Sequence, residues 1–190
     1  MDRLTVIKKY QRLIAIGLFL LVLFVIFELS GIRKNFSLDY VKDTLAENIL
    51  WGGFLFVLLF CAANLIQIPG WIFLAAAVLT LGKIHGGLLT YVAAVTSCVV
   101  TYGLIRALGN DALRELDSKV AVRIFRYLDE YPLLSIFALR SIFQTAPPLN
   151  YSLALSGIPF RNYVIGTIIG LPLPIVGYCL AFEFLFDELL

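Results

Sequence analysis

Long stretches of this chain contain no charged residue. Asp, Glu, Lys and Arg are all absent from Asn48 to Gly82, from Ile84 to Ile105, from Ser141 to Phe160 and from Asn162 to Phe182. A soluble domain spreads charges over its surface, whereas one charge at the centre of a bilayer costs roughly 2.5–3.5 kcal/mol. Hydrophobic residues make up 61% of the 190 residues, against about 45–50% in soluble domains. Because helices satisfy their own backbone in lipid, the pattern predicts an all-α, multi-pass membrane protein.

Basic residues cluster before the first apolar run, at Arg3, Lys8, Lys9 and Arg12. The positive-inside rule therefore predicts a cytoplasmic N-terminus, and the plasma membrane is the expected location. Residues 1–35 should form an N-terminal transmembrane helix and a loop, because no small-residue cleavage site follows the run. The net charge of +2 gives no reason to expect a nucleic-acid partner.

Residues 36–109 are predicted to form a first structural unit. A surface helix over 36–48 precedes a charge-free run that is too long for one span of about 20 residues and short for two. Pro69 and Gly70 place a turn at residues 67–70. The arm after this turn, about 12 residues, rises only about 18 Å and should re-enter the membrane. Whether Ile49–Ile66 crosses is left open, and Gly86–Ile105 should be a full transmembrane helix.

Residues 110–190 repeat this order. A surface helix over Asn110–Glu130 precedes a hairpin turning at residues 144–150, where Pro147 and Pro148 stand, and Tyr163–Phe186 is expected to be one last span. The two units predict inverted repeats with re-entrant broken hairpins, an arrangement that points to a midplane binding site. A bundle of five or six kinked spans without a site is the alternative.

Arg140 is the charge that most demands an explanation, because it lies in an apolar arm just before the Pro-Pro turn. A guanidinium suits a phosphate group, so we predict a substrate site formed by Arg140, Gln144, Thr145 and Asn150. The alternative is structural: Arg140 would pair with turn carbonyls or with Glu183, and the other three would satisfy backbone groups freed by the prolines.

The first turn offers Asn64 and Gln67 as further substrate-binding candidates, with helix–helix hydrogen bonding as the alternative. No enzyme motif occurs, and the chain has one histidine, His85, so neither an enzyme nor a metal or other cofactor is expected. Cys61, Cys98 and Cys179 lie in separate apolar segments and are interpreted as packing residues.

The second unit resembles the DedA/VTT superfamily, also called the SNARE-associated Golgi protein family. The residues that carry the resemblance are Arg140, Pro147-Pro148, Asn150-Tyr151, Phe160, Gly166-Thr167, Gly170 and Pro172. The first unit adds weaker similarity at Ile68-Pro69-Gly70, Gly86-Gly87 and Arg106–Gly109, so that about residues 45–185 are covered. The chain departs from the family in having Ala154 where glycine is frequent. It also has no carboxylate in residues 71–74, which argues against proton coupling.

The resemblance implies movement or scrambling of phospholipids or polyprenyl-phosphate lipids. Membrane lipids are then the expected partners, and a homo-oligomer is left open. Two other functions also stay open, namely a carrier for a small ion or solute and a non-transporting assembly protein. The missing acid at the first turn makes an anionic head group the favoured partner of Arg140, and an Arg140–Glu183 pair would count against this.

Overall fold

The computed structural model describes residues 49–109, 113 and 119–187, together with residues 14, 17–19, 21, 22 and 25. Every element within this part of the chain is a helix. Two helices, Gly70–Gly109 and Phe160–Phe182, are long and apolar enough to cross a membrane. The prediction of an all-α fold is confirmed for this part of the chain, and the two long apolar helices agree with a membrane protein. The predicted surface helix at 36–48 and most of the N-terminal span lie outside the described residues.

The first hairpin is formed by α4 (Ile49–Leu65) and the start of α5 (Gly70–Gly109). Gly82 interrupts α5 with φ 78° and ψ 167°, so that a short arm, 70–81, turns into a long arm, 83–109. A Cβ atom on Gly86 would overlap the backbone of Ala77, which shows that the two arms touch directly after the turn. Glycine is required at both positions, for its backbone angles at one and for its small size at the other.

The second half contains α6 (Lys119–Glu130), α7 (Pro132–Phe143), α8 (Pro147–Leu155), α9 (Phe160–Gly170) and α10 (Pro172–Asp187). Two elements of this half have finer bounds than the predicted ones. The second turn occupies residues 144–146, because proline is favoured at the first helical position and Pro147 begins α8 there. The last span bends at Leu171 and splits into α9 and α10, because Pro172 has no backbone N–H.

The same order of features occurs twice along the chain. In each half a helix ends near a glutamine with positive φ, at Gln67 (φ 68°) and Gln144 (φ 53°). A short helix follows and ends at a glycine with positive φ, at Gly82 (φ 78°) and Gly157 (φ 75°), before a longer helical segment. This recurrence agrees with the predicted pair of hairpins. Their inversion and their re-entry into the membrane stay predictions.

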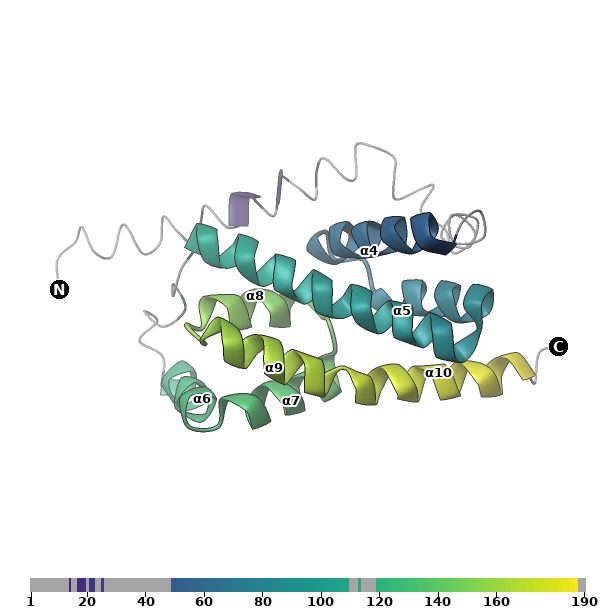
Figure 1. Ribbon diagram of the computed structural model, residues 1–190. Coiled ribbons are helices and arrows are strands. Elements are labelled where there is room, and N and C mark those ends of the chain that lie inside the picture. The colour runs from purple at the N-terminus through teal and green to yellow at the C-terminus, as the bar shows by residue number, and fades with distance from the viewer. Residues whose placement is uncertain are drawn as a thin grey trace.

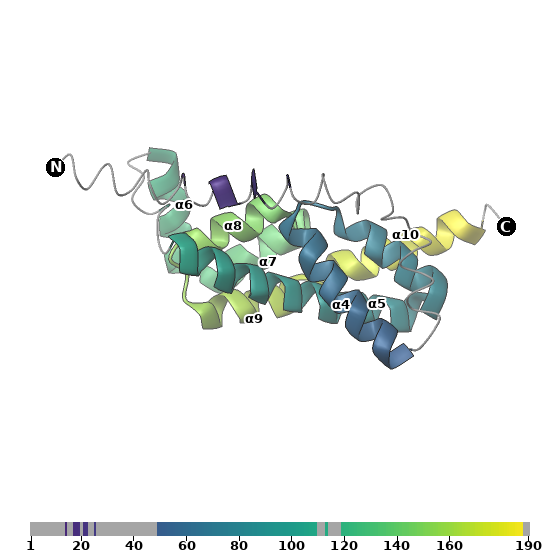
Figure 2. The same ribbon diagram turned by 90° about the horizontal axis from the view of Figure 1, so that it is seen from above.

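The long arm of α5 is the centre of the molecule. It runs diagonally across Figure 1, and α5 contacts α4, α8, α9 and α10. The helices α9 and α10 follow one another along α5, and α7 packs against α9. Figures 1 and 2 both place α6 at the end of the molecule opposite to α10. The two hairpins therefore meet against one long helix, which positions the site described below.

Two glycines bring α7 and α9 close together. A Cβ atom on Gly166 would lie 2.7 Å from Cβ of Ile136, and one on Gly170 would lie 2.7 Å from Cβ of Arg140. Such small residues let the backbones of membrane helices approach closely. The arginine is therefore pressed against α9 over the length of its side chain.

Tyrosine hydroxyls satisfy backbone carbonyls where helices end or break. They donate from Tyr151 to Leu65 (2.8 Å), from Tyr102 to Ile158 (2.6 Å) and from Tyr91 to Ile168 (3.0 Å). Ile168 stands four residues before Pro172, which has no N–H to offer its carbonyl, and Leu65 is the last residue of α4, so that its carbonyl has no helical partner. Broken helices survive at membrane depth only when such groups find partners.

Candidate functional site

Arg140 lies in the last turn of α7 with its side chain fully buried. Its guanidinium donates four hydrogen bonds, from Nε to Thr167 Oγ1 (3.3 Å), from Nη1 to the carbonyl of Gln144 (2.8 Å) and to Asn150 Oδ1 (2.6 Å), and from Nη2 to the Tyr163 hydroxyl (2.8 Å). Guanidinium has five N–H donors in a fixed fork. One side chain thus joins the turn, α8 and α9.

The second turn brings Asn150 back onto the arginine. Gln144 is the C-cap of α7, and its N–H donates the last helical hydrogen bond, to the carbonyl of Arg140 at 2.9 Å. Its φ of 53° then turns the chain out of the helix. The chain then restarts as α8, and Asn150 lies in the first turn of this helix. Its Nδ2 donates to the carbonyl of Thr145 at 3.1 Å, so that the asparagine closes the turn as well as accepting from Arg140.

Helix α9 supplies Tyr163 and Thr167, which stand four residues apart and so share one face. Both side chains are fully buried. The Tyr163 hydroxyl accepts from Arg140 and donates to the carbonyl of Cys98 in α5 at 3.0 Å. The Arg140 Cζ atom also lies 5.3 Å from the centre of the Tyr163 ring, within cation–π range.

The two hairpin turns touch at this network. Asn150 Nδ2 donates to Asn64 Oδ1 at 3.3 Å, and the Tyr151 hydroxyl reaches the carbonyl of Leu65. Gly70, at the start of the short arm, is so close to the second turn that an added Cβ would lie 3.1 Å from Thr145 Oγ1. Asn64, Asn150 and Thr145 are all buried.

The charge of Arg140 is held by neutral groups. Its four acceptors are two hydroxyls, a carboxamide and a backbone carbonyl. Among the side chains that the structure describes, the carboxylates are those of Asp129 and Glu130, which are exposed on α6. A buried charge without a counter-charge is costly. Within the described part of the chain, the region around the two turns therefore has a net positive charge in surroundings of low dielectric constant, and the side chain of Glu183, the other predicted partner of Arg140, lies outside that part.

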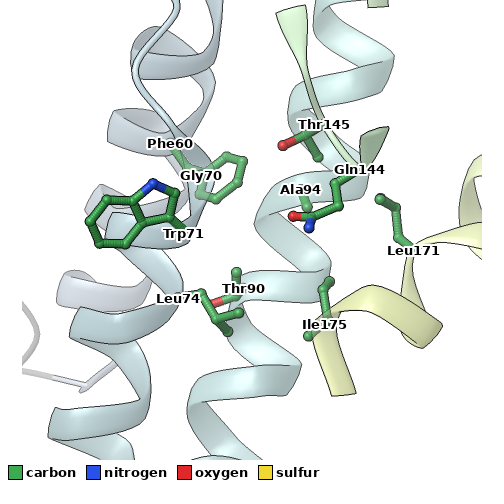
Figure 3. A pocket seen from close by; sticks show the side chains of 10 residues that line it. All are labelled: Phe60, Gly70, Trp71, Leu74, Thr90, Ala94, Gln144, Thr145, Leu171 and Ile175. Carbon is green, nitrogen blue, oxygen red and sulfur yellow. The ribbon is translucent and has the colours of Figure 1, made fainter. Parts of the chain in front are cut away.

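A small cavity lies beside this charge, between the two turns (Figure 3). Its volume of about 20 Å³ is enough for one group of the size of a water molecule. Phe60, Gly70, Trp71 and Leu74 come from the first hairpin, Gln144 and Thr145 from the second turn, and Thr90, Ala94, Leu171 and Ile175 from the long arm of α5 and the α9–α10 break.

Three uncharged polar side chains reach this cavity. Thr90 is 3% exposed, and its Oγ1 has no hydrogen-bond partner among the described residues. The Thr145 hydroxyl and the Gln144 carboxamide lie on the opposite wall, and Figure 3 shows all three around the same space. Elsewhere Thr96 donates to the carbonyl four residues earlier in its own helix, at 2.8 Å. The Thr90 hydroxyl makes no such bond to a described residue, and of the three buried hydroxyls of this kind on α5 it is the one that lines the cavity.

The predicted site residues fall into three groups. Arg140, Asn150 and Asn64 form the buried network, whereas Gln144 and Thr145 line the cavity. Gln67 is exposed in the first turn and does not join either group. The predicted turn residues flank the two turns, with Gly70 in the cavity wall.

Sequence reasoning missed the partners from other helices. Thr167 was named only among the residues that carry the family resemblance, and Tyr163, Cys98 and Thr90 were not assigned to the site. The spacing of Tyr163 and Thr167 on one helical face was the available signal. Nothing in the sequence marks Thr90, because its role depends on how α5 lies against the second turn.

No metal-binding cluster occurs within the described part of the chain. His85 is exposed, and the three cysteines are buried and free. The Cys98 thiol lies 3.5 Å from Asn150 Oδ1, at the edge of the arginine network.

Comparison with known protein families identifies a domain in this chain. The VTT domain matches residues 68–184, which is more than half of the chain. The matched region includes the second turn, Arg140 and every cavity residue except Phe60. No curated protein and no solved structure matches the chain.

Proposed function

The chain belongs to the VTT domain family, and from this premise we propose that it moves phospholipids or polyprenyl-phosphate lipids across the bilayer. The head group would pass between the two hairpin turns while the acyl tails stay in the membrane. The family supports a membrane protein of the DedA type. The kind of molecule that is moved is inferred from the geometry of the candidate site.

The observation that carries the proposal is the buried guanidinium without a described counter-charge beside an uncharged polar cavity. A fixed positive charge in a site of low dielectric constant attracts an anion more strongly than it would in water. Phosphate is the anion that every candidate lipid carries. The neutral donors of the cavity could bind its oxygens without the cost of burying a further charge.

Arg140 contributes from behind the cavity wall. Its described hydrogen bonds are made inside the protein, and one of them holds the carbonyl of Gln144, whose carboxamide lines the cavity. We therefore assign direct phosphate contacts to Gln144, Thr145 and Thr90. Arg140 holds the second turn in place and supplies the positive potential.

The size of the cavity sets a condition on transport. A volume of about 20 Å³ admits one phosphate oxygen but not a whole head group. Passage therefore requires the turns to separate, and the contact to be broken is the Asn150–Asn64 hydrogen bond of 3.3 Å together with the Tyr151–Leu65 bond of 2.8 Å. Both join neutral groups, and each such bond contributes only about 0.5–1.5 kcal/mol.

The test is leaflet exchange of fluorescent phospholipids in vesicles that contain the purified protein. We expect faster exchange than in empty vesicles, and a reduced rate for Thr145→Val, which removes a cavity hydroxyl at nearly constant volume. Thr96→Val is the matched control, because that hydroxyl is bonded within its own helix.

Three outcomes would contradict the proposal. No gain in exchange over empty vesicles, across several anionic and zwitterionic head groups, would refute lipid movement. Uptake of labelled ions or solutes with unchanged lipid exchange would favour a carrier instead. An equal rate of leaflet exchange for Thr145→Val and Thr96→Val would show that the lipid head group does not pass through the cavity.

A further inference from the structure

A second hollow lies on the outer side of the α9–α10 break. It is a groove of about 510 Å³ between residues 83–91 of α5 and residues 172–180 of α10. Apart from Lys83 and Tyr91 its lining side chains are apolar. This volume falls within the range of about 300–1,000 Å³ that is typical of ligand pockets.

The rims of the groove face outward. Leu88 is 61% exposed, Val176 55% and Leu180 50%. In a membrane protein such a surface meets the acyl region of the bilayer, so the groove opens to lipid tails. At its floor the helices touch, because an added Cβ on Gly87 would lie 3.0 Å from Cys179 Sγ.

Ile175 connects the groove with the polar cavity. This side chain is 9% exposed and lines both hollows. Two residues that precede Ile175 in the chain line one hollow each: Leu171 lines the cavity and Pro172 lines the groove. A polar space and an apolar space thus lie on either side of one side chain, at the point where the last span is broken.

The break itself is fixed from the wall of the groove. Pro172 cannot donate to the carbonyl of Ile168, and the hydroxyl of Tyr91 donates to it instead at 3.0 Å. Tyr91 is also a groove residue. The wall that would contact a tail therefore also holds the helix ends that separate the groove from the cavity.

We propose that the groove between α5 and α10 binds one acyl chain of a lipid whose phosphate enters the polar cavity, with Ile175 between the two parts. The inference rests on the proposed function and names its cargo as an intact amphipathic lipid. A free phosphate would need the cavity alone. The two hollows together match a molecule with one polar end and one apolar end.

Photocrosslinking tests the groove directly. The probe is a phospholipid with a diazirine on its acyl chain, placed in vesicles with the full-length protein, and the adducts are mapped by peptide mass spectrometry. We expect adducts to concentrate on residues 83–91 and 172–180, and Val176→Phe, which fills the groove, to cause a several-fold loss. Val100→Phe is the control, because Val100 is 38% exposed on α5 but lines neither hollow.

Leaflet exchange measured on the same variants separates the two claims. If the wild type exchanges lipid and Val176→Phe slows exchange several-fold while Val100→Phe does not, both hold. Groove adducts without any exchange would support the tail site and refute transport. Adducts spread evenly over exposed residues such as Phe54 and Leu58 of α4 would refute the groove as an acyl-chain site. An equal loss of adducts in Val176→Phe and Val100→Phe would refute it as well.

Discussion

Replacement of Arg140 by lysine keeps the positive charge and removes the fork. Four acceptors surround the guanidinium, on Thr167, Gln144, Asn150 and Tyr163. An ammonium group has three donors on a single nitrogen. At least one of the four acceptors must therefore lose its partner in Arg140→Lys.

The magnitude follows from that count. A hydrogen bond to a charged group contributes about 1.5–3 kcal/mol to the free energy of unfolding. For a protein of this length 1 kcal/mol changes the Tm by about 2–4 °C, so that one lost bond lowers it by about 3–12 °C. Because the two Nη atoms make the shortest bonds, 2.6 and 2.8 Å, and lie beyond the reach of a lysine Nζ, we expect a second bond to weaken as well.

The assay is thermal unfolding of the protein in detergent at one fixed scan rate, followed by tryptophan fluorescence. Trp71 lies in the wall of the cavity between the turns and contributes to this signal together with Trp51 on α4. Arg126→Lys is the matched control, because Arg126 is exposed on α6 and its replacement should change the stability by less than about 0.5 kcal/mol.

A Tm of Arg140→Lys within 2 °C of that of Arg126→Lys, a limit set from the stability scale of about 2–4 °C per kcal/mol, would refute the reasoning. The guanidinium fork would then not be what joins the turn to α8 and α9. A lower Tm together with unchanged leaflet exchange would keep the structural role and remove Arg140 from the transport mechanism.

Gly170→Ala should lower the stability by about 1–3 kcal/mol, because its Cβ would lie 2.7 Å from that of Arg140. Gly103→Ala, which meets nothing within 4 Å, should be neutral or stabilising by up to about 1 kcal/mol. Equal Tm values for the two alanine variants would contradict the close packing of α7 on α9. Tyr91→Phe should cost about 1–3 kcal/mol by leaving the carbonyl of Ile168 without its donor. Hydrogen exchange should then show earlier opening around residues 168–176, and protection equal to that of the wild type would contradict it.

Much of the fold could be predicted because bilayers impose strict rules on local sequence. Charge-free runs predicted the apolar helices, and prolines predicted both turns to within a few residues. The bend at Leu171 was missed, because a proline within an apolar span is tolerated when a neighbour satisfies the freed carbonyl. That neighbour, Tyr91, lies far away in the chain.

Part of the candidate site could also be predicted from local sequence, and part depends on contacts between distant helices. Asn150 was associated with Arg140 because the two residues belong to one turn. Tyr163 and Thr90 come from α9 and α5, and their polar atoms have no partner that the local sequence could reveal. Long-range packing of helices decides which hydroxyls meet the guanidinium and which face the cavity.

The pairing of the Tyr91 hydroxyl with the carbonyl that Pro172 leaves free has an evolutionary consequence. The hydroxyl is needed as a donor only where Pro172 breaks the last span. A tyrosine at position 91 and a proline at position 172 should therefore covary among relatives, since the proline without that hydroxyl leaves a carbonyl exposed to lipid. A lineage that straightens the last helix by losing Pro172 is free to replace Tyr91 by phenylalanine, whereas the reverse order of substitutions passes through an unstable intermediate.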